Sequence, residues 1–389
     1  STDKKDGHFC RSELNQAFQK MKESNQNYLI DIIAGARPNF MKIAAIVHAI
    51  HEYNEEHEHK LNYRLIHTGQ HYDPIMSGRF FEQLSIPEPH INFGVGSGSQ
   101  AYQTGQIMMA YENAIAELRP NLCVVVGDVT STMACTLVAK KAEIKVAHVE
   151  GGIRSGDMSM PEEINRIVTD SISDYFFTTS KEAGKNLLKQ GMKEDQIFFV
   201  GNTMIDTLFT QLPNLQKPDF FETLDLDVKP YLVLTLHRPS NVDEPQTLNK
   251  LLTLLSTHSA GHTLVFPMHP RTKKIFDGLD QKFDNLYVTQ PMDYLSFIYL
   301  VKNAKGVITD SGGVTEESTL LHVPCMTLRN STERPETVSI GTNEMVGSDE
   351  EKILFYLHKM TNGTWKKGGI PELWDGKSGK RIVNCIAQF

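Results

Sequence analysis

Short apolar runs recur along the chain and alternate with segments in which apolar residues follow helical spacing. The runs at residues 28–34, 121–126 and 306–309 contain few polar residues. Runs of this kind are typical of parallel strands that helices cover on both faces. Further strands are predicted at residues 63–67, 145–149, 174–178, 198–200, 231–236, 263–267, 285–289 and 324–328. Strands that alternate with helices predict doubly wound parallel sheets of the α/β class.

The alternation is interrupted between residues 210 and 230, where three prolines lie among mixed charges. This composition is typical of a linker. We therefore predict two Rossmann-like domains, residues 28–206 and 207–369, which face each other across a ligand-binding cleft. Residues 1–27 are polar and predict an N-terminal extension. Residues 370–389 are expected to end in a helix that packs back on the N-terminal domain.

Composition and charge narrow the class of protein. The chain has 389 residues, of which 40% are hydrophobic and 22% charged, as is common in globular proteins. A net charge of −8 without a long basic block argues against a nucleic-acid partner. No apolar run is long enough to span a bilayer and the N-terminus lacks a signal-peptide core, so we expect a cytoplasmic protein without a membrane partner. The five scattered cysteines form no CxxC pattern, which indicates buried thiols in a reducing compartment and no zinc site.

Residues 306–317 predict an anion-binding site. A strand is followed by a turn of small residues at 311–313 and then by the start of a helix. Small residues let the backbone approach a ligand, and the free N–H groups of a helix start favour anions. One of the adjacent glutamates, Glu316 or Glu317, is expected to bind hydroxyls such as those of a ribose, because a carboxylate would repel a phosphate. The alternative is a tight strand–helix connection that binds no ligand.

Arg37 and Lys42 mark a second site of this kind. They lie in the sequence GARPNFMK (35–42), where the first strand turns into a helix. Two cations beside a helix start suit a phosphate or diphosphate. The Gly-Lys-Ser/Thr ending of a Walker loop is absent. The alternative role of Arg37 is that of a structural ion-pair partner.

Two carboxylates come within two residues of the ends of predicted strands. Asp128 and Glu150 lie at the edge where open α/β sheets place their ligands. Farther along, Pro161 begins a helix in which Glu162 and Arg166 are four residues apart on one face. The alternatives are that Asp128 caps the next helix and that Glu162 and Arg166 form an internal ion pair.

Taken together, these motifs resemble the non-hydrolysing UDP-N-acetylglucosamine 2-epimerase family. The matching segments follow one another with family-like spacing across nearly the whole chain after residue 28. They are GARPNFMK (35–42), TGQHYD (68–73), GDVTST (127–132), HVEGGIRSGD (148–157), MPEEINR (160–166), GNTMID (201–206), LHRPSN (236–241), TDSGGVTEE (309–317) and RNSTERPE (329–336).

The resemblance implies a glycosyltransferase-B-like fold of two Rossmann-like domains. It implies interconversion of UDP-GlcNAc and UDP-ManNAc without a nicotinamide or metal requirement. The family mechanism is anti-elimination of UDP to a 2-acetamidoglucal intermediate, followed by re-addition after C2 is protonated on the other face. A homodimer and a cell-surface polysaccharide pathway are further implications of the resemblance.

The resemblance also assigns roles to residues. The acid/base groups would be Asp128, Glu150 and Glu162, and His237 would also lie in the active site. The diphosphate and ribose would be bound by Arg37, Lys42, Ser311, Gly312, Gly313 and Glu317, with Arg166 supporting the site. Removing a proton and returning one on the opposite face requires a base and an acid, and clustered carboxylates can divide these tasks.

Some segments depart from the family pattern. Gln70 and His71 match part of a regulatory UDP-GlcNAc site, but Tyr72 follows where many members have Arg. Gly152 stands where Ala is common. The Arg-Pro-Asn sequence at 37–39 is typical of a subgroup that also accepts related UDP-sugars, such as 2,3-diacetamido or uronic derivatives.

Three other functions compete with this interpretation. A hydrolysing epimerase would release ManNAc and UDP, but its relatives depart from the Val-Glu-Gly-Gly and Pro-Glu-Glu patterns present here. A glycosyltransferase of the same fold would need an acceptor site. A UDP-sugar-binding protein without catalysis would not need the set of Asp128, Glu150, Glu162 and His237.

Overall fold

The computed structural model describes residues 28–69, 81–279 and 281–389. The chain divides into two compact units. Unit 1 contains the described residues up to 154, together with residues 158–203 and 377–389, and unit 2 contains residues 155–157 and 204–376. Each unit is built around one parallel sheet with helices between the strands, which confirms the predicted α/β class with two doubly wound domains.

The sheet of unit 1 has seven strands in the order β3-β2-β1-β4-β5-β6-β7. All neighbouring strands in it are parallel. The strands are β1 (Tyr28–Ala34), β2 (Leu61–His67), β3 (Ile91–Asn92), β4 (Leu122–Val126), β5 (Lys145–Val149), β6 (Tyr175–Thr178) and β7 (Ile197–Phe199).

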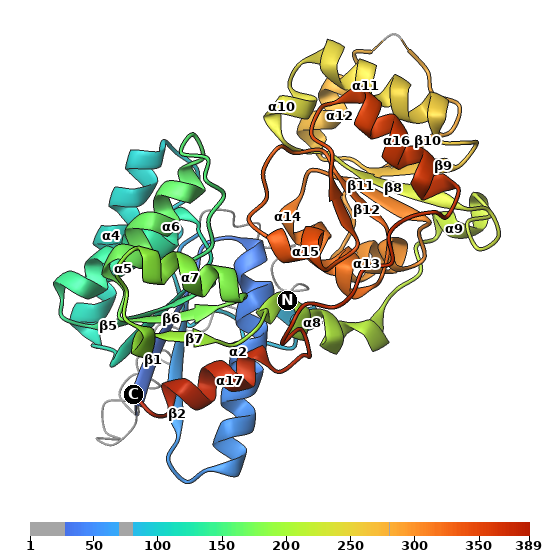
Figure 1. Cartoon of the computed structure of the whole chain (residues 1–389). Helices are drawn as coiled ribbons and strands as arrows, with labels where there is room; N and C mark the ends of the chain where they lie inside the picture. The colour runs from blue at the N-terminus through green and yellow to red at the C-terminus, as the bar shows by residue number, and fades with distance from the viewer. Residues whose placement is uncertain (1–27, 70–80, 280) are drawn as a thin grey trace, which may run out of the picture. The chain divides into compact units, whose positions relative to one another are not determined.

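Helices cover both faces of this sheet (Figure 1). On one face α5 packs between α4 and α6, and on the other face α2 packs against α17, the last helix of the chain. The helices of unit 1 are α2 (Arg37–Glu56), α4 (Gln100–Glu117), α5 (Thr130–Lys141), α6 (Pro161–Ile172), α7 (Lys181–Lys189), the 3-10 helix η1 (Glu194–Gln196) and α17 (Ser378–Ile386).

The sheet of unit 2 has six strands in the order β10-β9-β8-β11-β12-β13, again all parallel. The strands are β8 (Tyr231–Thr235), β9 (Thr263–Pro267), β10 (Leu286–Thr289), β11 (Gly306–Thr309), β12 (Cys325–Thr327) and β13 (Asn343–Met345). The helical segments are α8 (Thr203–Gln211), η2 (Leu212–Asn214), α9 (Phe220–Thr223), α10 (Pro239–Val242), α11 (Pro245–His258), α12 (Pro270–Phe276), α13 (Tyr294–Lys302), α14 (Gly312–Leu320), α15 (Pro335–Ser339) and α16 (Glu350–Thr361).

Strand β8 shows why a parallel strand in this fold is apolar throughout. Leu232 and Leu234 pack in the same core as the buried leucines of α11 and α16. Tyr231 and Val233 point to the opposite face and pack in a second core with residues of α9, α13 and α14. Because successive side chains of a strand alternate between faces, a sheet that is covered on both faces favours apolar residues on both sides of its strands.

The segment at residues 210–230 differs from the predicted linker. It contains η2 and α9, and Phe221 and Leu226 are buried in the second core of unit 2. Its prolines therefore lie in or beside short structured elements of unit 2, and the apolar side chains between them pack into the core. The short strands β3 and β13 were not predicted, because two or three residues with polar members carry no usable periodicity.

Two expectations from composition concern the described part of the chain. Cys123, Cys135 and Cys325 are free and buried, which confirms that these thiols serve as small core residues. Among the residues described above, no helix combines the length and the apolar character that a membrane span requires. Residues 1–27 lie outside the described residues.

Candidate active site

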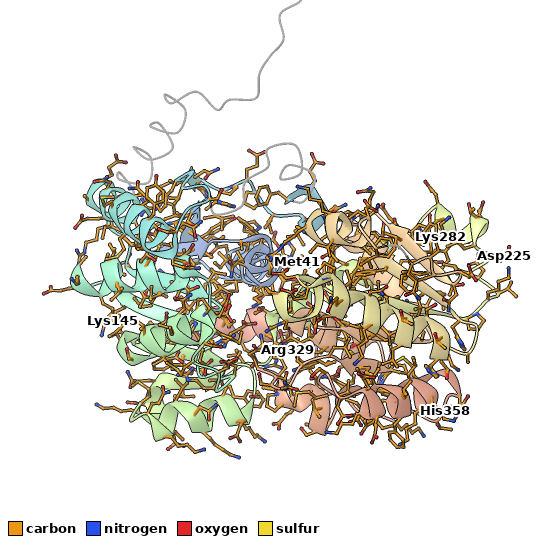
Figure 2. The ribbon with its side chains drawn as sticks, turned by 90° about the horizontal axis from the view of Figure 1, so that it is seen from above. Met41, Lys145, Asp225, Lys282, Arg329 and His358 are labelled. Atoms are coloured by element: carbon orange, nitrogen blue, oxygen red, sulfur yellow. The ribbon has the colours of Figure 1, made fainter. Side chains whose placement is uncertain are left out.

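The carboxyl ends of β1, β4 and β5 lie side by side in unit 1. Ile33 of β1 is paired with Val125 of β4, and Val126 is paired with Val149 of β5. The turns after these strands therefore meet at one edge of the sheet. Lys145, at the other end of β5, is exposed on the outside of the unit (Figure 2). This register brings together the start of α2, Asp128 and Glu150, as a shared sheet edge predicts.

Asn39 holds the turn after β1 against the end of β4. Its side-chain oxygen accepts hydrogen bonds from the N–H groups of Gly35 and Ala36, at 3.2 Å and 2.9 Å. Its amide group donates to the carbonyl oxygen of Val126 at 2.9 Å. The residue is 3% exposed, so all of these groups are satisfied within the protein. The start of α2 is thereby fixed beside the turn that carries Asp128.

Lys42 and Glu150 form an ion pair at this edge. Nζ of Lys42 lies 2.6 Å from Oε2 of Glu150, and the side chains are 13% and 4% exposed. A Cβ atom on Gly127 would lie 3.4 Å from Nζ and 3.6 Å from Oε2, so the turn after β4 lies directly against the pair. The ammonium group stabilises the negative charge of a carboxylate that is otherwise shielded from water.

The backbone of Glu150 is held in an uncommon conformation. Its φ angle is +71°, in the left-handed region that a residue with a Cβ atom seldom adopts. Its N–H group donates to the carbonyl oxygen of Phe177 in β6 at 2.9 Å. Strain of this kind persists only where the surrounding structure enforces it, and it is concentrated at functional sites.

Asp128 is held by α6. Its Oδ2 accepts a hydrogen bond from the guanidinium group of Arg166, and its backbone carbonyl accepts one from Asn165 at 2.8 Å. The cap of α5 is Val129, so the alternative in which Asp128 caps that helix is wrong. Arg166 also binds Glu163, three residues earlier, at 2.7 Å. The helical ion pair considered for Glu162 is thus made by its neighbour Glu163, whereas Glu162 is half-buried.

These contacts give unit 1 two carboxylates on adjacent turns, each beside a cation. One carboxylate can remove a proton from carbon and another can return one, provided that their protonation states differ. Charges in such surroundings interact strongly because little water separates them. Lys42 and Arg166 place one positive charge beside each of the two carboxylates at this edge of the sheet.

In unit 2 the carboxyl ends of β8 and β11 are also adjacent, since Thr235 is paired with Thr309. This pairing places His237 beside Asp310. Nδ1 of His237 lies 2.9 Å from Oδ1 of Asp310, and the histidine side chain is 56% exposed while the aspartate is buried. Asp310 also accepts hydrogen bonds from the N–H of Arg238 at 3.0 Å and from Asn241 at 2.9 Å. Burial alone would raise the pKa of Asp310, but His237, the side chain of Asn241 and the backbone N–H of Arg238 hold it below its usual value.

The turn before α14 contains the residues predicted to bind a diphosphate. Ser311 is the N-cap residue, and Gly312 and Gly313 are the first two residues of the helix. Arg329, which follows β12 (Figure 2), makes two hydrogen bonds to Glu333, at 2.9 Å and 2.7 Å. A Cβ atom on Gly312 would lie 3.8 Å from a guanidinium nitrogen of Arg329, whereas one on Gly313 would meet no atom within 4 Å. A helix start with small residues and an adjacent guanidinium group suits an anion.

Both glutamates of α14 are buried, and they differ in their surroundings. Oε1 of Glu316 lies 2.5 Å from Nε of Arg334, so Glu316 is an ion-pair partner. Burial raises the pKa of Glu317 to about 8, and the neighbouring charge of Glu316 adds to this rise, whereas Tyr294 opposes it. Of the two candidates considered for hydroxyl binding, Glu317 is the one that no arginine neutralises among the ion pairs of the described residues.

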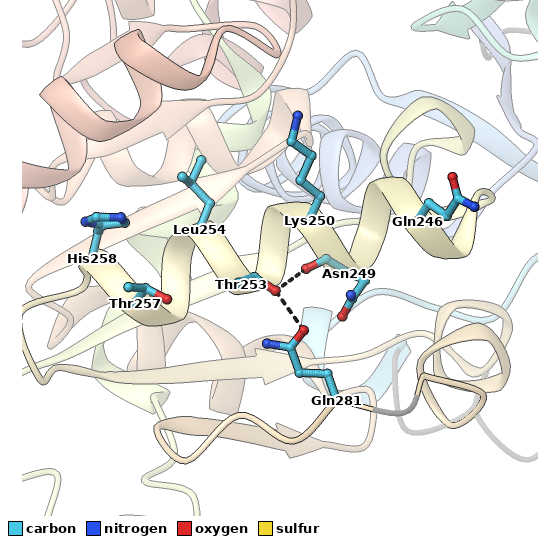
Figure 3. A pocket seen from close by; sticks show the side chains of 8 residues that line it. All are labelled: Gln246, Asn249, Lys250, Thr253, Leu254, Thr257, His258 and Gln281. Carbon is cyan, nitrogen blue, oxygen red and sulfur yellow. Dashed lines mark hydrogen bonds between the residues drawn. The ribbon is translucent and has the colours of Figure 1, made fainter.

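Some predicted residues cannot be placed. Gln70 and His71 lie outside the described residues, and the same holds for the side chain of Arg37. A shallow depression over α11 contains none of the predicted site residues (Figure 3). Its lining side chains are Gln246, Asn249, Lys250, Thr253, Leu254, Thr257, His258 and Gln281.

The sequence did not single out three residues that the structure places at these sites. They are Glu163, Asp310 and Arg329, and each binds a predicted site residue or lies beside one. Asp310 follows strand β11 directly, as Asp128 nearly does after β4, so its position at a strand end was an available signal. The partners of Glu163 and Arg329 depend on side-chain directions that the sequence does not reveal.

Comparison with known proteins places this chain in a family. The profile of the family described as UDP-N-acetylglucosamine 2-epimerase matches residues 54–387. A UDP-N-acetylglucosamine 2-epimerase of Methanocaldococcus jannaschii is 40% identical over 373 residues, covering 92% of this chain and 98% of that protein. A crystal structure of the M. jannaschii UDP-GlcNAc 2-epimerase in complex with UDP-GlcNAc and UDP has a TM-score of 0.81 at 39% identity, covering 93% of this chain and 100% of that chain. A UDP-2,3-diacetamido-2,3-dideoxy-D-glucuronate 2-epimerase of Pseudomonas aeruginosa is 37% identical over 361 residues, covering 92% of this chain and 99% of that protein. This chain therefore belongs to the UDP-N-acetylglucosamine 2-epimerase family.

Proposed function

We propose that the chain interconverts UDP-GlcNAc and UDP-ManNAc by inverting C2 of the sugar, without hydrolysing the nucleotide. The observation that carries this proposal is the pair of carboxylates on the turns after β4 and β5, each beside a cation. Inversion at a carbon that bears a proton requires a base on one face and an acid on the other. Family membership supplies the substrate class, because the relatives named above act on UDP-sugars.

The reaction is proposed to proceed by elimination and re-addition. A carboxylate removes the C2 proton, the C–H electrons form a C1–C2 double bond, and the C1–O bond breaks with its electron pair going to UDP. The resulting 2-acetamidoglucal receives a proton at C2 on the opposite face, and a diphosphate oxygen attacks C1. Substrate and product contain the same atoms, so no oxidant or reductant is consumed. Asp128, Glu150 and Glu162 are the carboxylates to which we assign proton transfer.

The residues of unit 2 are proposed to bind the nucleotide. The N–H groups at the start of α14 and the guanidinium group of Arg329 favour the diphosphate, whose negative charge increases as the C1–O bond breaks. Glu317 is proposed to bind the ribose hydroxyls. A carboxyl group with a pKa of about 8 is protonated below that pH and can donate as well as accept a hydrogen bond.

A second candidate substrate is a 2,3-diacetamido uronic UDP-sugar. The 37% identity with the P. aeruginosa enzyme over nearly its whole length favours this candidate specifically. The same proton-transfer residues would act on it, because both substrates carry a proton and an acetamido group at C2. The two candidates differ in the groups at C3 and C5, so measurements on both substrates separate them.

The proposal is tested by incubating the purified protein with UDP-GlcNAc and separating the products by anion exchange. We expect a UDP-GlcNAc and UDP-ManNAc mixture that approaches equilibrium from either side. Accumulation of free ManNAc together with UDP would contradict the non-hydrolysing reaction. The variants Asp128→Asn and Glu150→Gln are expected to lose turnover and to keep UDP affinity, measured by calorimetry. An equal loss of UDP affinity would assign these carboxylates a structural role.

A further inference from the structure

A histidine is buried behind the two turns that carry Asp128 and Glu150. His148 lies in β5, two residues before Glu150, and is 0% exposed. Its Nδ1 lies 2.6 Å from Oδ1 of Asp170, and its Nε2 lies 2.7 Å from the carbonyl oxygen of Gly127. Asp170 is also completely buried.

The partners of His148 determine where its protons are. A carbonyl oxygen can only accept a hydrogen bond, so Nε2 must carry a proton. Asp170 also accepts from the guanidinium group of Arg154 at 2.7 Å and from the N–H of Gly152 at 3.0 Å. Burial alone would raise the pKa of Asp170, but His148 and Arg154 together hold it below its usual value. Both ring nitrogens therefore face oxygen acceptors, a carboxylate at Nδ1 and a carbonyl oxygen at Nε2.

The His148–Asp170 pair connects three elements of the candidate active site. Through Gly127 it holds the residue that precedes Asp128, and through Gly152 it holds the turn that follows Glu150. Asp170 belongs to α6, the helix that also carries Arg166, and Arg166 binds the Asp128 carboxylate directly. The pair therefore fixes both carboxylate-bearing turns to one helix.

We propose that His148 and Asp170 form a positioning pair that sets the relative positions of the Asp128 and Glu150 carboxylates for the two proton transfers. This inference rests on the proposed function. Neither residue needs to touch the substrate, because each acts through a backbone group of an adjacent turn. The enforced φ angle of +71° at Glu150 agrees with this role, since a strained turn needs a fixed support. A small displacement of reacting groups lowers the reaction rate strongly, so fixing the two carboxylates in position raises the rate.

The first test is the variant Asp170→Asn. An asparagine presents an NH2 group in place of one oxygen, so at least one of the donors from His148, Arg154 and Gly152 loses its acceptor. We expect kcat to fall by about 100-fold, the effect of a small misplacement of reacting groups. The dissociation constant for UDP, measured by calorimetry, is expected to stay unchanged, because the bonds of His148 and Asp170 described above reach no residue assigned to nucleotide binding.

A matched control separates positioning from stability. Asp31 is a buried carboxylate in the same sheet. It binds Arg64 at 2.7 Å and accepts a hydrogen bond from Tyr111, and neither of these partners belongs to the turns that carry Asp128 and Glu150. Asp31→Asn is expected to lower the thermal midpoint as Asp170→Asn does, but to keep kcat. A loss of kcat in Asp31→Asn that equals the loss in Asp170→Asn would overturn the proposal, as would an unchanged kcat in folded Asp170→Asn.

Inactivity of the chain on the proposed UDP-sugars would refute only the proposed function. Two measurements without substrate then still test the positioning pair. In the first, the protein is labelled with 15N-histidine and the His148 signal is identified by its absence from His148→Gln. A proton on Nε2 is expected in the wild type, because the bond to the Gly127 carbonyl oxygen requires a donor; an Nε2 without a proton would overturn the proposal. In the second, amide hydrogen exchange should become faster at residues 127–129 and 150–152 in Asp170→Asn and not in Asp31→Asn. Unchanged exchange at both turns would contradict the positioning role.

Discussion

Replacing Lys42 by methionine tests the ion pair at the centre of unit 1. The change removes an ammonium group 2.6 Å from Oε2 of Glu150 and leaves a carboxylate that is only 4% exposed. Removing one partner of a buried pair costs about 3–5 kcal/mol, because the remaining charge loses its compensation. Lys42 is 13% exposed and can take in some water, so we expect about 3 kcal/mol, at the lower end of this range.

The expected loss is large enough to measure in a protein of this size. A loss of about 3 kcal/mol corresponds to a fall of about 10 °C in the midpoint of a domain of roughly 200 residues. Scanning calorimetry of Lys42→Met gives the midpoint, and urea titration followed by circular dichroism gives the free energy of unfolding. Lys250→Met is a suitable control, because the Lys250–Glu350 pair is exposed and such pairs contribute about 1 kcal/mol or less.

The double variant Lys42→Met/Glu150→Gln decides whether the ion pair is the cause. Removing the carboxylate charge as well should restore most of the stability, because no uncompensated buried charge remains. Glu150→Gln alone should be less harmful than Lys42→Met, since a lysine can extend its ammonium group towards water. Strictly additive losses in the double variant would refute the reasoning and show that Lys42 stabilises the unit by packing alone.

Three further predictions concern Glu317, Asp310 and Gly152. The folded pKa of Glu317 is raised to about 8, so between pH about 4.5 and about 8 the folded state keeps a proton that the unfolded state releases. The free energy of unfolding should therefore fall with rising pH in this window, by about 1.4 kcal/mol per pH unit from this group. Urea titrations of Glu317→Gln should lack this component. The pKa of Asp310 is lowered, so its contribution to the free energy of unfolding is complete above pH about 4 and is lost as pH falls through the folded pKa. Asp310→Asn should lose about 2 kcal/mol of stability at neutral pH and be less sensitive to acid. An acid transition equal to that of the wild type would refute this assignment. Gly152→Ala should unfold the chain or lower its thermal midpoint steeply, because the new Cβ would lie 2.2 Å from a backbone oxygen at a φ of +81°. Gly151→Ala, the control, should be tolerated with small shifts of its neighbours. Equal thermal midpoints for the two variants would contradict this geometry.

The Gly152 geometry also gives a physical reason for one departure from the family pattern. An alanine, considered common in the family at this position, does not fit here, because the carbonyl of Ala183 occupies the space that its Cβ would need. The close approach of α7 to this turn is a tertiary contact and has no local signal in the sequence. In contrast, the strands β1, β5, β9 and β11 have the predicted bounds, because largely buried parallel strands are mostly apolar runs between turns.

The sequence predicted where the site residues lie, but not which side chains bind one another. Asp128 and Glu150 were found because they follow apolar strands, and the register of β4 and β5 then makes them neighbours. Which cation binds which carboxylate depends on side-chain directions. The sequence therefore left a Glu162–Arg166 ion pair open as an alternative, and Arg166 binds Asp128 and Glu163 instead. His148 illustrates the same limit, because its two acceptors come from residues 21 and 22 positions away in the sequence.

The central claim is that carboxylates of unit 1 transfer the C2 proton of a UDP-sugar. Proton NMR of UDP-GlcNAc incubated with the protein in D2O tests it most directly, because a proton that is removed and returned is exchanged with solvent. We predict that deuterium appears at C2 of both UDP-GlcNAc and UDP-ManNAc, and that Asp128→Asn and Glu150→Gln slow this exchange. Epimerised product that retains its original hydrogen at C2 would contradict the account.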